Sequence, residues 1–143
     1  MNKIILPLLV GALSLGSSFA VQAHTVSDAV AKSPPEAPYK AVSSLVKLPD
    51  FIPGMGQLFV DPATLPAGPF LAYDRDGKLV STIYMIPIQD MVPEKSFSDL
   101  KVPGIAVDHT DIMYNAGHPG VEVPHVHIVL WHIPAGEENR VAK

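Results

Sequence analysis

Residues 106–134, AVDHTDIMYNAGHPGVEVPHVHIVLWHIP, contain five of the six histidines in the chain. Two stretches rich in apolar and β-branched residues, 106–114 and 121–133, flank the turn-forming segment 115–120, NAGHPG. This pattern is typical of two antiparallel strands joined by a loop longer than the tight two-residue turn. The sequence therefore predicts a β-hairpin that carries a cluster of histidines.

The predicted pairing of the two strands determines which side chains meet. If the loop is centred near His118, His109 lies opposite His127 and Asp111 lies opposite His125, with directly paired Cβ atoms roughly 4.5–5.5 Å apart. Alternate residues of a strand share a face, so His125 and His127 project together. We therefore expect these four side chains to converge, while His118 either reaches over them from the loop or caps the turn. A slip of one residue would send one set to the other face.

Imidazole and carboxylate ligands in a chain without cysteine favour Zn²⁺ or Cu²⁺ over Ca²⁺ or Mg²⁺. Three protein ligands leave a fourth position for water, whereas four protein ligands make a structural or storage site. Asp111 is expected either to bind the ion or to orient an imidazole through its second ring nitrogen. The predicted metal site comprises His109, His118, His125, His127 and Asp111.

The other face of the last predicted strand carries Val126, Ile128, Leu130 and His132. Because three of these four residues are apolar, this face is expected to point into the core. His132 ends that apolar face and is therefore interpreted as a hydrogen-bonded structural histidine rather than a metal ligand.

Residues 1–23 have the layout of a secretory signal peptide: Lys3, an apolar run over 4–15, and small residues before cleavage after Ala23 or Ala20. The apolar run is shorter than the roughly 20 residues of a membrane span. We expect a protein exported to the periplasm or the extracellular space, without membrane attachment. The polar, proline-bearing residues 24–38 are predicted to be a flexible arm.

Residues 39–143 are long enough to fold as one domain with its own core. Loss of Lys3 with the signal peptide changes the formal net charge from −4 to −5, which argues against nucleic acid and anionic membrane as partners. Without disulfides, an exported fold relies on its core, with metal binding or homo-oligomerisation as further support.

The rest of the domain also has the pattern of strands. Residues 57–60 form a short predicted strand, and 70–73 and 79–86 form a hairpin about the turn Asp-Arg-Asp-Gly at 74–77. The many prolines disfavour long helices. The predicted class is mainly β, a small antiparallel sandwich or partly open barrel with one or two short helical turns, one of them over 96–100.

Two family resemblances involve the histidine region. Gly117-His118-Pro119 followed by Val123-Pro124-His125 resembles the Gly-His-x-Pro…Pro-His signature of a bacterial family of small exported β-rich domains without an assigned activity. That family has a histidine four residues after the one matching His125, where this chain has Val129. Gly120, His125 and His127 are similar to the first cupin motif, but the glutamate of that motif is missing.

These observations leave three functions open. The first is a non-catalytic exported domain whose histidines hold Zn²⁺ or Cu²⁺ in a binding or assembly role. The second is a small metal-dependent hydrolase or cupin-like oxidoreductase, in which Asp111 and His118 assist proton transfer. The third is a domain whose histidines are structural and bind no metal. The sequence favours the first and names no substrate.

Overall fold

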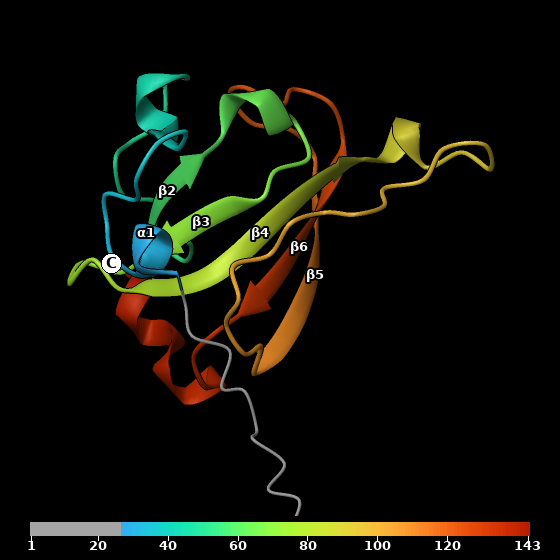
Figure 1. Cartoon of the computed structure of the whole chain (residues 1–143). Helices are drawn as coiled ribbons and strands as arrows, with labels where there is room; N and C mark the ends of the chain where they lie inside the picture. The colour runs from blue at the N-terminus through green and yellow to red at the C-terminus, as the bar shows by residue number, and fades with distance from the viewer. Residues whose placement is uncertain (1–26) are drawn as a thin grey trace, which may run out of the picture.

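The computed structural model describes residues 27–143; the predicted signal peptide and residues 24–26 lie outside this range. Six strands form one open antiparallel sheet in the order β1-β2-β3-β4-β6-β5 (Figure 1). This confirms the mainly β prediction. The strands are β1 (Lys40–Ala41), β2 (Gln57–Val60), β3 (Phe70–Tyr73), β4 (Leu79–Pro87), β5 (His109–Asn115) and β6 (His125–Trp131).

The β3–β4 hairpin forms where the turn chemistry predicted it. Gly77 has a φ of +71°, a conformation that glycine adopts without steric cost. The Asp74 carboxylate accepts hydrogen bonds from the backbone N–H groups of Asp76 and Lys78, which closes the turn. The predicted strand at 57–60 is also confirmed, as β2.

Both faces of the sheet carry a hydrophobic core. On one face, side chains of the segment 42–55 pack over β2, β3, β4 and β6. On the other face, α1 (Asp28–Ala31) places Val30 against Phe59, Leu71 and Tyr73, and Ile105 packs there from the long loop before β5. The Tyr73 hydroxyl donates to the Val30 carbonyl at 2.8 Å.

This packing places the described part of the predicted arm against the sheet. Residues 27–38 contain α1, and the Ser33 hydroxyl donates to Gln57 Oε1 at 2.7 Å. Val30 is the residue of this segment that belongs to the core, and it packs against the aromatic side chains of Phe59 and Tyr73 on β2 and β3.

The prediction for the two faces of β6 is wrong. The buried face carries His125, His127, Val129 and Trp131, whereas Val126, Ile128 and Leu130 are only half-buried. The physical reason is that the segment 42–55 covers the histidine face. The opposite face is left partly open near the edge strand β5, where Ile112 is 71% exposed.

The long loop between β4 and β5 extends beyond the sheet and returns along it (Figure 1). The Tyr84 hydroxyl donates to the Lys101 carbonyl and ties the returning part to β4. The helical turn predicted over 96–100 is absent, and Asp99 has a φ of +57°, which a right-handed helix cannot continue through.

Helices contribute little to the described part of the chain. They are α1 and the 3-10 helices Val42–Ser44, Pro62–Thr64, Ile88–Asp90 and Ala135–Val141. Within residues 27–143, no helix has the length and apolar character needed to span a bilayer.

Candidate metal centre

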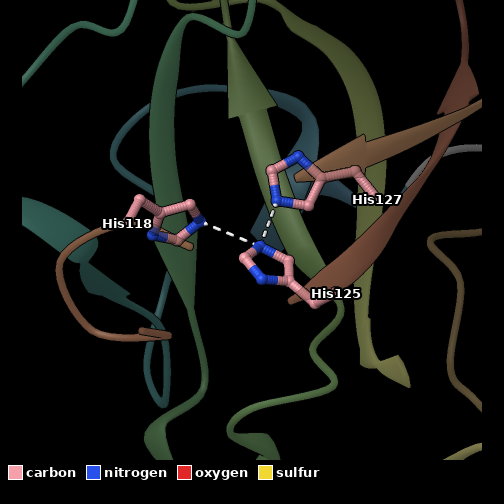
Figure 2. A group of neighbouring side chains, drawn as sticks. All are labelled: His118, His125 and His127. Atoms are coloured by element: carbon pink, nitrogen blue, oxygen red, sulfur yellow. Dashed lines mark hydrogen bonds between the residues drawn. The ribbon is translucent and has the colours of Figure 1, made fainter. Parts of the chain in front are cut away.

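Three histidine rings converge on the buried face of the sheet, and we call His118, His125 and His127 the histidine triad (Figure 2). The Nε2 atom of His125 lies 2.9 Å from His127 Nε2 and 3.2 Å from His118 Nε2. His125 is 0% exposed and His127 is 4% exposed, while His118 is half-buried. The three rings therefore direct the same kind of nitrogen atom toward one point.

The strand and the loop position these rings in different ways. His125 and His127 share a face of β6, where they pair with Pro87 and Met85 of β4. His118 lies in a tight turn closed by reciprocal backbone hydrogen bonds of 3.0 Å with Val121. Gly117 has a φ of +132°, and a Cβ atom there would lie 2.7 Å from a backbone oxygen. Only glycine lets the loop fold this close and present His118 to the strand.

Hydrogen bonds to backbone carbonyls fix the tautomers of two triad rings. His125 Nδ1 lies 2.8 Å from the Val123 carbonyl oxygen, and His118 Nδ1 lies 3.0 Å from the Pro119 carbonyl oxygen. A carbonyl oxygen only accepts, so both Nδ1 atoms must carry hydrogen and donate. In the neutral rings, both Nε2 atoms then present lone pairs to each other at 3.2 Å.

Two facing lone pairs repel unless a cation lies between them. Bonds of about 2.0–2.1 Å in tetrahedral geometry give nitrogen–nitrogen separations of about 3.3 Å. The observed separations of 2.9 and 3.2 Å are close to this value. The backbone carbonyls at Nδ1 are also the partners that typically orient a metal-binding imidazole. The donor set therefore fits a divalent transition-metal ion.

The site favours the uncharged form of the His127 imidazole. Burial, followed by the proximity of His125 and His118, lowers the pKa of His127 to about 4. A ligand histidine must be deprotonated at the coordinating nitrogen to bind a metal ion. His127 is thus ready to coordinate at neutral pH without first losing a proton.

An apolar cavity of about 220 Å³ adjoins the triad. His118 and His127 form part of its wall, together with Asn115 from the end of β5. The remaining lining side chains are apolar and come from the segment 42–55 and from β2, β3 and β4: Val42, Leu48, Ile52, Met55, Leu58, Phe70, Ile83 and Met85. A ligand bound in this cavity would lie beside the triad.

The predicted register of the histidine hairpin is wrong, so the predicted ligands divide into two groups. His109 pairs with Trp131 instead of His127, and Asn115 pairs with His125. The turn between His118 and Val121 moves the midpoint of the connection to position 120. The observed register differs from the predicted one by four residues, an even number, so His109 stays on the face of the sheet that was predicted for it. Its partner Trp131 lies four residues along β6 from His127, so His109 is about 13 Å from the predicted position.

His109 and Asp111 instead form a second cluster with Glu138, from the C-terminal 3-10 helix. His109 donates through Nδ1 to Asp108 at 2.9 Å and through Nε2 to Glu138 at 3.0 Å. Asp111 accepts from the Trp131 indole N–H at 2.9 Å. With both ring nitrogens bound to carboxylates, His109 is best described as an imidazolium in an ion-pair cluster. No periodic pattern in the sequence pointed to Glu138.

We expect the charged state of His109 to be measurable in solution. The hydrogen bond to Asp108, supported by Glu138, raises the pKa of His109 above its ordinary value of 6.5. NMR titration of its ring protons should show this shift, and Glu138→Gln should reduce it. A His109 pKa below 6.5 would contradict the ion-pair description.

His132 is the structural histidine that the sequence predicted. Its Nε2 lies 2.8 Å from the Thr82 hydroxyl, and its Nδ1 lies 3.0 Å from the Ala106 carbonyl oxygen. Both ring nitrogens therefore have partners within the protein, away from the triad.

A protein family and a solved structure are similar to this chain. A family model described as "TTHB210-like: Hypothetical protein TTHB210" matches residues 74–114. The crystal structure of hypothetical protein TTHB210 from Thermus thermophilus is similar, with 40% sequence identity and a TM-score of 0.57. The alignment covers 66% of this chain and 87% of that chain. No curated protein matches the sequence.

Proposed function

The chain belongs to the TTHB210-like family, and from its histidine triad we propose that it is an exported metal-binding domain. His118, His125 and His127 would each supply Nε2 to one ion. The signal-like residues 1–23 support the proposed export to the periplasm or the extracellular space. With an ion bound at the triad, the domain would have a non-catalytic role in binding or assembly.

One observation carries the metal proposal. The Nε2 atoms of His118 and His125 lie 3.2 Å apart, although carbonyl partners keep the hydrogen of each ring on Nδ1. A hydrogen-bonded structural pair would have one hydrogen between the two nitrogens. The triad thus has the arrangement of a ligand set rather than that of an ordinary polar network.

Nitrogen ligands without thiolate support Zn²⁺ or Cu²⁺ as the bound ion. Cu²⁺ generally binds such sites more tightly than Zn²⁺, so affinity alone does not identify the ion used in the cell. Three protein ligands would leave a fourth position for water or another ligand.

The cavity beside the triad supports a second candidate function, a small metal-dependent enzyme. A metal-bound water in the fourth position has a lowered pKa and can act as a nucleophile. Among residues 27–143, however, the cavity lining contains no carboxylate or lysine to assist proton transfer. This composition favours a binding role over catalysis.

Metal analysis tests the proposal directly. Protein purified from its own cells without chelators should contain about one Zn²⁺ or Cu²⁺ ion per chain. Calorimetric titration should show that His118→Ala and His127→Ala weaken binding by more than the factor of about 10–100 that loss of an outer partner costs. His118 is half-buried and lies in a mostly exposed loop, so its replacement tests the site even if changes on β6 impair folding.

His109→Ala provides the matched control, because His109 lies on β5 outside the triad. This variant should bind the ion with an affinity close to that of the wild type. An equal loss in His109→Ala, or no binding by the wild-type protein, would contradict the proposal.

A further inference from the structure

The cavity beside the triad indicates which class of ligand completes the proposed metal site. We propose that it binds a small apolar monocarboxylate, with one carboxylate oxygen on the metal ion and the hydrocarbon part in the cavity. This inference rests on the proposed function, because it requires a metal ion at the triad. Its support comes from the volume, lining and charge of the cavity.

The volume limits the size of the ligand. A closed apolar cavity of about 150 Å³ can hold benzene. The cavity here measures about 220 Å³, which leaves space for a few further heavy atoms. A single ring or a short aliphatic chain with one carboxylate fits this volume.

The lining determines the polarity of the ligand. The walls of the cavity are apolar apart from Asn115, His118 and His127. A ligand with several hydroxyl groups would therefore lose hydrogen bonds to water on binding without regaining them from the protein. Burying hydrocarbon against these walls contributes about 25 cal/mol for each Å² removed from water. The polar end of the ligand must therefore lie at the histidine side.

Charge favours an anion at that end. Three neutral imidazoles leave both positive charges of a divalent ion uncompensated. Among residues 27–143, no charged side chain lines the cavity to balance them. A buried charge without a partner is costly, so a bound carboxylate is favoured over a neutral head group of similar size.

Asn115 supplies a donor for the second carboxylate oxygen. Its side-chain oxygen accepts from the Gly117 backbone N–H at 2.8 Å, which identifies the remaining group as the NH₂ donor. Because Asn115 lines the cavity with His118 and His127, this donor belongs to the same wall as the metal ligands. A carboxylate offers one oxygen to the ion and one to the amide.

Cobalt-loaded protein provides the test, since the visible spectrum of Co²⁺ responds to a change in its ligands. Benzoate and hexanoate should change the spectrum and bind the full-length Co²⁺ protein at least about tenfold more tightly than the metal-free protein, a difference of about 1.4 kcal/mol. Benzyl alcohol, the neutral analogue, and succinate, a dianion, should each bind at least about tenfold more weakly than benzoate.

Three variants test the cavity and the Asn115 amide separately from the metal ion. Leu48→Trp fills the cavity and should weaken benzoate binding at least about tenfold, while Co²⁺ affinity stays within about twofold. Leu65→Trp makes the same change in the wall of the neighbouring smaller cavity, which Leu65 lines without reaching the larger one, and should leave benzoate binding unchanged. Asn115→Asp keeps the oxygen that accepts from Gly117 but replaces the donor with a negative charge, so it should also weaken benzoate binding about tenfold.

The outcomes distinguish this inference from the function on which it rests. If Co²⁺ binds but benzoate leaves the spectrum unchanged, or binds no better than benzyl alcohol, the monocarboxylate proposal fails and the metal site stands. Unchanged benzoate affinity in Leu48→Trp would also overturn it. If Co²⁺ does not bind at the triad, both proposals fail together.

Discussion

Zn²⁺ at a thousandfold excess over its dissociation constant is expected to raise the free energy of unfolding by about 4 kcal/mol, because the ion binds only the folded arrangement of the triad. The unfolded chain does not hold His118 and His125 at 3.2 Å, so it offers no comparable site. For a domain of this size, such an increase corresponds to a rise in Tm of roughly 10–20 °C. Urea unfolding with and without Zn²⁺ measures the effect.

His127→Phe and Asp111→Asn show where the stabilising ion binds. His127→Phe keeps a ring of similar size on β6 but removes a ligand nitrogen, so Zn²⁺ should give little added stability. Asp111→Asn changes the second cluster, where Asp111 accepts from Trp131, and should retain the full Zn²⁺ effect. If both variants lose the effect equally, the stabilisation does not come from the triad.

The elements that the sequence predicted well are those governed by local chemistry. β2, β3 and β4 follow from alternating or β-branched runs and from a turn that places Gly77 where φ is positive. The meeting of His125 and His127 depends only on the period-two geometry of a strand. Neither feature requires knowledge of a distant segment.

The histidine register could not be predicted in the same way. The register depends on how many residues of the connection lie before and after its midpoint. The turn closed by His118 and Val121 places that midpoint at position 120 instead of 118. The even shift preserved the face of His109 but separated it from the triad along the strand. The same turn brought in His118, whose role the sequence had left open.

Burial of the histidine face depends on tertiary structure. Both faces of β6 carry apolar residues, so periodicity alone does not identify which is covered. The segment 42–55 supplies that cover through side chains such as Leu48 and Ile52, and these also line the cavity. Glu138 reaches His109 from a 3-10 helix after β6 in the same non-local way.

The metal-free protein should lose stability as the pH falls from about 6.5 to about 4. Burial is the main reason that the pKa of His127 is lowered to about 4, against an ordinary value of 6.5. In this window the unfolded chain binds a proton at His127 while the folded protein does not, so acid favours unfolding. At about 1.4 kcal/mol per pKa unit, the loss from this group approaches about 3 kcal/mol.

Urea unfolding of chelator-treated protein at pH 7, 5.5 and 4.5 measures this dependence, with His127→Phe as the matched variant. His109 and Asp74 also titrate with altered pKa values, but they are common to both proteins, so the difference between the two profiles reports position 127 together with its interactions with His125 and His118. The wild-type profile should fall more steeply because Phe binds no proton. Parallel profiles across the window would mean that folding does not keep His127 neutral, and the site would then have to release a proton before it could bind a metal ion.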